Sequence, residues 1–285
     1  MKKRQRAGFY FILPWLIGLI VFTAFPMLAA AYISLTDWDI VGNAKFIGLD
    51  NFKNVFRSEE FIKSLWVTFR YAILAVPLII ATSLTMAVMV SKNYKGMRIF
   101  RVIYYMPAIV SGVAVAIVFK WILDPSYGLI NGVLSFFHIK GPDWLYDPDW
   151  VLPSYLIMAM WGAGGSLLTY LAALKDIPQD LYDAAMIDGA NTWKKVKYIT
   201  IPLMTPIIFY NLVLGIIAAF RKFTDAYVLG GAGKEGNFYM VYLYEEAFGH
   251  YRMGYATALA WILFVIILLL TILVNWTKKY WGYSE

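Results

Sequence analysis

Long apolar segments alternate with shorter polar segments along most of this chain of 285 residues. Six apolar stretches lie at about residues 9–34, 65–90, 99–122, 151–174, 203–224 and 254–277. Each holds roughly twenty residues or more, and a helix of that length spans a hydrocarbon core of about 30 Å. The pattern predicts an all-α integral membrane protein with six transmembrane helices in a single transmembrane domain, residues 1–285.

The segment between the fourth and fifth stretches, residues 175–202, is too polar to cross a bilayer, yet it carries ordered local signals. Gly189 can adopt the left-handed geometry that ends a helix. Asn191 or Thr192 can cap a second short helix, which we expect to run until Pro202 opens the next span. The sequence therefore predicts a compact helix-turn-helix at the membrane surface, which another protein can bind.

The composition agrees with a membrane location. Apolar residues make up 61% and aromatic residues 18% of the chain, whereas soluble domains contain roughly 45–50% apolar residues. The chain has no cysteine and two histidines, His138 and His250. A disulfide, a thiolate metal site or a histidine-based catalytic group is therefore not expected. The sequence predicts a protein that is not an enzyme, with no catalytic residue and no metal site.

The net charge of +7 is unevenly placed along the chain. Basic residues gather in four groups, at Lys2, Lys3, Arg4 and Arg6, at Lys92, Lys95, Arg98 and Arg101, at Lys175, Lys194, Lys195 and Lys197, and at Lys278 and Lys279. The positive-inside rule places these groups, and so both termini, in the cytoplasm. The charge therefore predicts topology and contact with the headgroups of a lipid bilayer, and no nucleic acid partner.

The polar segment also carries a recognisable motif. Asp183-Ala184-Ala185 is followed after three residues by Gly189, and nine further residues lead to Ile199-Thr200-Ile201-Pro202. This spacing is similar to the EAA loop of permease subunits in bacterial binding-protein-dependent ABC importers, where Glu-Ala-Ala, three residues, Gly, nine residues, Ile, one residue and Leu-Pro follow each other. The chain departs from that pattern twice, because Asp183 replaces the glutamate and Ile201 replaces the leucine.

Four other stretches resemble the branch of this family that imports sugars, of the maltose and glycerol-phosphate type. They are Phe46–Phe52, Tyr105–Ala108, Pro125–Asn131 and Met253–Ala256. The resemblance implies a permease subunit of an ATP-driven carbohydrate importer in the bacterial cytoplasmic (inner) membrane. Its substrate would be an oligosaccharide, and the chain would form half of the translocation pathway.

The resemblance also implies partners and a coupling role. The partners would be a second related permease, two ATPase subunits and an extracytoplasmic solute-binding protein. The chain itself would bind no cofactor, because ATP and Mg²⁺ belong to the ATPase. The polar segment would sit in a cleft of the ATPase, and the residues implied in that coupling are Asp183, Ala184, Ala185, Asp188, Gly189, Ile199 and Pro202.

The fifth apolar stretch presents one helical stripe of small and polar residues. Its members are Asn211, Gly215, Ala218 and Lys222. Such a stripe in a membrane is often a surface for helix packing, and it also leaves room for a ligand, so both interpretations stay open. In the family, the span after the EAA loop contributes sugar contacts, and the matching positions are Gly215, Ala218 and Lys222.

Two adjacent cations at the end of this stretch bear on the charge of the substrate. An ionisable group within a span is costly and tends to face protein or water. Arg221 and Lys222 therefore suggest an acidic, uronate-containing oligosaccharide. The alternative is that Asp225, three residues after Lys222, neutralises part of this charge in a local ion pair.

The fourth apolar stretch supplies two further candidates for the substrate path, Trp161 and Gly162. An indole ring can stack on the apolar face of a sugar, and glycine permits close packing or local unwinding of a membrane helix. A place for Trp161 in the helix packing is the competing interpretation.

An ion-coupled secondary sugar transporter is the main alternative function. Proton or sodium coupling requires carboxylates inside the spans. No aspartate or glutamate lies within the six predicted stretches. That distribution favours an importer driven by a separate ATPase.

Overall fold

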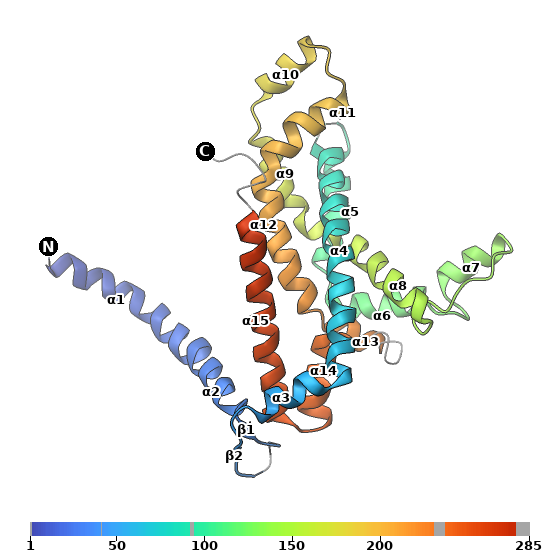
Figure 1. The fold of residues 1–285 in the computed structure, drawn as a ribbon. Helices are drawn as coiled ribbons and strands as arrows, with labels where there is room; N and C mark the ends of the chain where they lie inside the picture. Colours follow the sequence, from blue (N-terminus) through green and yellow to red (C-terminus); the bar gives the residue numbers. More distant parts are fainter. Residues whose placement is uncertain (1, 41, 92–93, 231–236, 278–285) are drawn as a thin grey trace. The chain divides into compact units, whose positions relative to one another are not determined.

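Helices make up nearly all of the regular structure (Figure 1). The computed structural model describes residues 2–40, 42–91, 94–230 and 237–277. The sheet found in these ranges is an antiparallel pair of two-residue strands, β1 (Thr36–Asp37) and β2 (Lys45–Phe46). The predicted all-α class is therefore confirmed for the described part of the chain.

Five helical segments in the described ranges are long and apolar enough to cross a membrane. They are Phe11–Ile33, Glu59–Ser91, Pro148–Lys175, Thr192–Leu229 and Met253–Thr277. A helix satisfies all its backbone hydrogen bonds internally, which is why apolar segments of this length fold this way in lipid. They correspond to five of the six predicted spans.

The remaining predicted span, residues 99–122, is not one straight helix. Helix α5 (Met97–Tyr105) continues into the 3-10 turn η2 (Met106–Ala108), and helix α6 (Gly112–Ile122) leaves at an angle of 96°. Pro107 lacks the backbone N–H that a helix needs, and Ser111, with ψ 133°, has left helical geometry before α6 begins. The predicted count of six spans is met when this bent pair counts as one.

Contacts divide the chain into two compact units, which are described separately. The first comprises Met1–Ile62 and Tyr242–Val265, and the second comprises Lys63–Val241 and Ile266–Glu285. The elements of the first unit include α1 (Lys2–Leu19), the π turn η1 (Ile20–Ala24), α2 (Phe25–Ile33), α3 (Asp50–Arg57) and the π turn η6 (Glu245–Gly249).

In the first unit, Asn51 and Gly254 both pack against the backbone carbonyl of Thr36. The buried amide of Asn51 donates to the carbonyl oxygens of Ser34 (2.9 Å) and Thr36 (2.8 Å). Gly254, near the start of α15 (Met253–Thr277), lies so close that a Cβ there would be 2.0 Å from the Thr36 carbonyl oxygen. Asn51 and Gly254 belong to two of the stretches that carry the family resemblance, and the structure gives both a packing role.

The core of the second unit lies where α4 (Glu59–Ser91), α9 (Leu167–Lys175) and α12 (Ile201–Phe220) meet. Its buried members are Ala87, Val90, Leu167, Tyr170, Leu171 and Met204. Lipid tails are as apolar as these side chains, so close packing rather than exclusion of water holds such helices together.

The packing is tightest where two short 3-10 turns touch. Helix α8 (Pro148–Trp161) ends in the turn η3 (Gly162–Ser166), which packs on η2. A Cβ on Gly164 would lie 1.7 Å from the backbone oxygen of Tyr104. Only glycine allows the two backbones to approach this closely.

The predicted helix-turn-helix follows α9 and is confirmed. It consists of α10 (Gln179–Ile187), α11 (Thr192–Lys195) and the π turn η4 (Val196–Thr200). Within the second unit, α10 and α11 lie at one end, and α13 (Thr224–Leu229) lies at the other end (Figure 1). The unit also contains α7 (Leu129–Phe136), and α14 (Tyr239–Tyr244) begins in it.

Candidate functional site

The turn between α10 and α11 has a well-defined hydrogen-bond pattern. Gly189 has a φ of +74°, in the left-handed region. Its N–H donates to the carbonyl of Met186 (3.1 Å), and the N–H of Ala190 donates to the carbonyl of Ala185 (2.8 Å). These two bonds form a Schellman motif, which satisfies the last carbonyls of α10 and fixes the direction in which the chain leaves it.

The cap of α11 is Asn191, and not Thr192. The Oδ1 atom of Asn191 accepts a hydrogen bond from the backbone N–H of Lys194 (2.9 Å), as an N-cap does. The sequence left both residues open, and Thr192 instead begins the helix. The angle between α10 and α11 is thus defined by Gly189 on one side and Asn191 on the other.

The second short helix does not end at Pro202, which corrects the prediction. α11, η4 and α12 form one uninterrupted helical segment from Thr192 to Phe220. In the π turn, the N–H of Ile201 donates to the carbonyl of Val196, five residues earlier. Because the pairing pattern has already shifted before Pro202, the missing N–H and the bulk of the proline ring are accommodated without a break.

The residues implied in coupling fall on this run of elements. Asp183, Ala184 and Ala185 lie on α10, Asp188 is its C-cap, Gly189 follows, Ile199 lies in η4, and Pro202 lies in the first turn of α12. Asp183 is exposed and accepts a hydrogen bond from the side chain of Gln179 (3.1 Å). The neighbouring Ile187, 87% exposed, and Trp193, also exposed, add an apolar surface typical of an interaction site.

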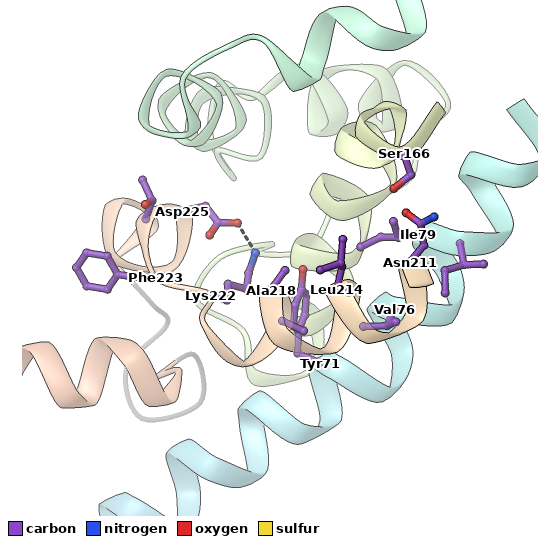
Figure 2. Close-up of a pocket in the computed structure, with 14 residues that line it drawn as sticks. Tyr71, Val76, Ile79, Ser166, Asn211, Leu214, Ala218, Lys222, Phe223 and Asp225 are labelled. Atoms are coloured by element: carbon purple, nitrogen blue, oxygen red, sulfur yellow. Dashed lines mark hydrogen bonds and ion pairs between the residues drawn. The ribbon is translucent and has the colours of Figure 1, made fainter. Parts of the chain in front are cut away.

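A pocket of about 450 Å³ opens in the second unit beside α12 (Figure 2). The whole predicted stripe lines it, namely Asn211, Gly215, Ala218 and Lys222. α4 contributes Tyr71 and Val76 from the facing side. A Cβ on Gly215 would lie 3.0 Å from the Cγ1 atom of Val76, so this glycine serves helix packing, while the rest of the stripe borders open space.

The polar groups of the pocket gather at its two ends (Figure 2). Lys222 and Asp225 face each other at one end, and Asn211 and Ser166 lie toward the other. The side-chain amide of Asn211 donates to the carbonyl of Ile207 on its own helix (2.9 Å), which orients the group. A few oriented polar groups on an otherwise apolar lining are typical of ligand pockets.

The two cations on which the acidic-substrate hypothesis depends, Arg221 and Lys222, have different environments in the structure. Lys222 forms an ion pair with Asp225, and only 9% of the lysine side chain and 24% of the aspartate side chain are exposed. Its ammonium also lies 4.7 Å from the ring centre of Tyr71 and 5.1 Å from that of Tyr155. Arg221 is exposed and does not line the pocket. The local ion pair that the sequence left as the alternative for Lys222 is therefore present.

The other two path candidates do not reach the pocket. Trp161 packs edge-on against Phe119, with ring centres 5.6 Å apart, and Gly162 begins η3. Ser166, at the end of the same turn, does line the pocket. Sequence reasoning did not name Ser166 or Tyr71 as pocket residues. The available signal was their polarity within predicted spans, a signal that other residues such as Thr68 and Ser154 share.

Comparison with known proteins defines the class. The family described as binding-protein-dependent transport system inner membrane component matches residues 79–281. The chain belongs to this family, which consists of the membrane-spanning permease subunits of ABC transporters. The predicted family is thus confirmed. As a permease, the chain is a multi-pass inner-membrane protein and not an enzyme, and ATP is handled by a partner subunit rather than by a cofactor site of its own.

Individual relatives match over nearly their full length. The chain is 40% identical to a probable ABC transporter permease protein, YesP, of Bacillus subtilis, over 100% of this chain and 94% of the relative. It is 33% identical to the trehalose/maltose transport system permease protein MalF of Thermococcus litoralis, over 95% of this chain and 94% of that one.

A solved structure agrees with the fold. In the crystal structure of a bacterial ABC transporter involved in the import of the acidic polysaccharide alginate, one chain superposes with a TM-score of 0.87. The two chains share 26% identity over 98% of this chain and 96% of that one.

Proposed function

We propose that this protein is a permease subunit of an ATP-driven importer of oligosaccharides and forms half of the translocation pathway. The observation that carries the proposal is the continuous helix from Thr192 to Phe220. The α10–α11 turn precedes one end of this helix, and residues near its other end line the pocket. Similarity to a trehalose/maltose permease and to an alginate importer supports carbohydrate as the cargo.

The α10–α11 turn is the proposed contact with the ATPase. The exposed surface of Asp183, Ala184 and Ile187 would enter a cleft of that subunit. Gly189 and Asn191 would hold the shape of the turn, and Ile199 and Pro202 would join it to the span. An ATPase that binds this surface would pull on α12 through the Gly189 turn, because α11, η4 and α12 run on from that turn without a break.

The proposed assembly contains a second related permease, two ATPase subunits and an extracytoplasmic solute-binding protein in the bacterial inner membrane. The family description itself refers to dependence on a binding protein. Lys175, Lys194, Lys195 and Lys197 flank the α10–α11 turn in the sequence and favour a cytoplasmic position for it. With an even number of spans, both termini would also be cytoplasmic.

The pocket is the proposed path for the sugar. Asn211 and Ser166 can exchange hydrogen bonds with hydroxyl groups, and the apolar side chains of Val76, Leu214 and Ala218 can lie against the apolar face of a sugar. Its volume of about 450 Å³ holds a small part of an oligosaccharide rather than a long chain.

An acidic, uronate-containing oligosaccharide is the second candidate substrate. The exposed Arg221 and the similarity to the alginate importer favour it. The ion pair of Lys222 with Asp225 counts against a role of Lys222 as a free cation in attracting an anion.

The test is uptake by proteoliposomes that contain the chain, its second permease and the ATPase, with the solute-binding protein added outside. A panel of labelled neutral oligosaccharides and galacturonate oligosaccharides is offered with and without internal ATP. We expect ATP-dependent uptake of at least one oligosaccharide, and loss of it on Ala218→Trp, which fills the pocket. Uptake by the isolated chain driven by a proton or sodium gradient would instead support the ion-coupled alternative.

A further inference from the structure

One hydrogen bond joins α10 to the π turn that precedes the pocket helix. The hydroxyl of Tyr182, which immediately precedes Asp183 on α10, lies 2.9 Å from the Oγ1 atom of Thr200. Thr200 is the last residue of η4 and is 3% exposed, so the bond reaches into the interior of the second unit. Its partners are eighteen positions apart in sequence.

Few other contacts tie α10 to its surroundings. Most of its side chains are exposed, and those of Tyr182 and Ala185 are among the partly buried ones. In the part of the chain that the structure describes, the Tyr182 bond is the one side-chain hydrogen bond from α10 to a different helix. The hydrogen bond between Gln179 and Asp183 stays within α10. The backbone turn at Gly189 is the remaining connection toward α11.

Thr200 connects this hydrogen bond to the pocket, because it directly precedes the helix that lines the pocket. η4 is a π turn, in which the Ile201 N–H pairs with the Val196 carbonyl, and turns of this type are rare and are frequently found at functional sites. The helix continues from Thr200 without a break to Asn211, Gly215 and Ala218, which line the pocket. A displacement of Thr200 therefore moves the axis of the helix that carries the pocket.

We propose that Tyr182 is a positioning residue for energy coupling, which ties α10 to the π turn η4 through Thr200 so that movement of the bound α10 displaces α12 and changes the pocket. The inference depends on the proposed function, in which α10 binds the ATPase. Without the bond, α10 can follow the ATPase while α12 stays behind, since Gly189 and the loop around it absorb the motion.

The experiment uses the assembled complex and two probes that need no knowledge of the cargo. The chain has no cysteine, so single substitutions report cleanly. Ile187→Cys, at an exposed position of α10, is cross-linked to the ATPase. Ala218→Cys, at an exposed position of the pocket, is labelled with a maleimide in the presence and absence of ATP and vanadate. The first probe reports docking, and the second reports movement at the pocket.

Tyr182→Phe and Thr200→Val each remove one side of the hydrogen bond with little change of shape. We expect cross-linking and ATP hydrolysis to persist in both, while the nucleotide-dependent change in labelling at the pocket falls roughly threefold to tenfold, the equivalent of one hydrogen bond. The double variant should be no worse than either single one, because the pair acts as a unit. Tyr198→Phe, on the same π turn but 67% exposed, is the matched control and should behave as the wild type.

The results that would contradict the inference differ from the result that would contradict the proposed function. An unaltered labelling change in Tyr182→Phe, with cross-linking intact, overturns the inference and leaves the proposed function standing. Loss of cross-linking in Tyr182→Phe overturns it as well, because the bond would then serve docking rather than transmission. Absence of cross-linking from Ile187→Cys in the otherwise unaltered chain contradicts the proposed function itself.

Discussion

Two proline-containing helical segments of the second unit have opposite outcomes. Around Pro107, the chain bends by 96° between α5–η2 and α6. Around Pro202, the helix runs on from η4 into α12. Both prolines lack the same N–H and carry the same ring, so the residue alone does not decide between a bend and a continuous helix.

The difference lies in the residues beside each proline. Ser111 leaves helical geometry after Pro107, and the backbone of Tyr104 is pressed against Gly164 of η3. Before Pro202, a π turn has already widened the helix, and Thr200 is anchored by Tyr182. The bend thus occurs where the backbone of η3 packs beside the proline turn, and the continuous helix occurs where the extra residue of a π turn absorbs the misfit.

The bent segment is most sensitive at its contact with η3. Gly164→Ala would place a Cβ 1.7 Å from the Tyr104 oxygen, so the two turns must separate. We expect a loss of about 3 kcal/mol in unfolding free energy, or failure to accumulate folded protein. Thermal unfolding in detergent measures it. Gly162→Ala, with nothing within 4 Å of the new Cβ, is the matched control and should be near neutral; equal behaviour of the two variants would contradict the proposed cause of the bend.

The ion pair between Lys222 and Asp225 lies just past the far end of the continuous helix and gives the next test. Lys222→Met leaves the Asp225 carboxylate without its partner beside the aromatic rings, and we expect a loss of about 2 kcal/mol, less than for a fully buried pair because Asp225 is partly exposed. Adding Asp225→Asn should restore at least half of the loss. If the double variant is the less stable one in thermal unfolding, the pair is not the source of stability at this position.

The near end of the continuous helix begins after Gly189, whose φ of +74° disfavours any side chain. Gly189→Ala should cost about 1 kcal/mol and slow ATP-driven uptake, because the Schellman turn that positions α10 is strained. Gly132→Ala, inside α7 with open space around it, is the control and should not lower stability. Unimpaired uptake in the Gly189 variant would show that the turn need not be held in this geometry.

The smallest effect is expected at Pro202 itself. Since η4 already accommodates the ring, Pro202→Ala should change the unfolding free energy by about 0.5 kcal/mol and leave ATP-driven uptake within about twofold. Measurement of uptake and thermal unfolding side by side checks both values. A large loss of uptake would mean that the proline, and not the π turn, sets the geometry of this segment.

The sequence was a good guide to the elements and a poor guide to their junctions. Apolar length was enough to predict the spans, because a helix in lipid has no competing way to satisfy its backbone. The turn at Gly189 was also predictable, since few residues accept a positive φ. The bend after Pro107 was not, because it involves a neighbour far away in sequence, Gly164, and the continuity through Pro202 was not, because it depends on a π turn that the apolar pattern does not reveal.

The residues of the candidate pocket were likewise predictable only in part. The spacing of Asn211, Gly215, Ala218 and Lys222 predicted a common face, and all four line the pocket. Trp161 was a reasonable candidate by chemistry, yet its ring packs on Phe119 instead. Ser166 entered the lining because a 3-10 turn rotates the residues after Trp161, and a local pattern of apolar residues does not reveal such a rotation.

The uninterrupted run from Thr192 to Phe220 has a simple mechanical consequence. At a rise of about 1.5 Å per residue the segment is roughly 40 Å long, so a tilt of about 10° around one end carries the other end sideways by about 7 Å. A modest rotation imposed at the α11 end is thereby magnified to about the width of a sugar ring at the pocket end, with no break in the helix between them.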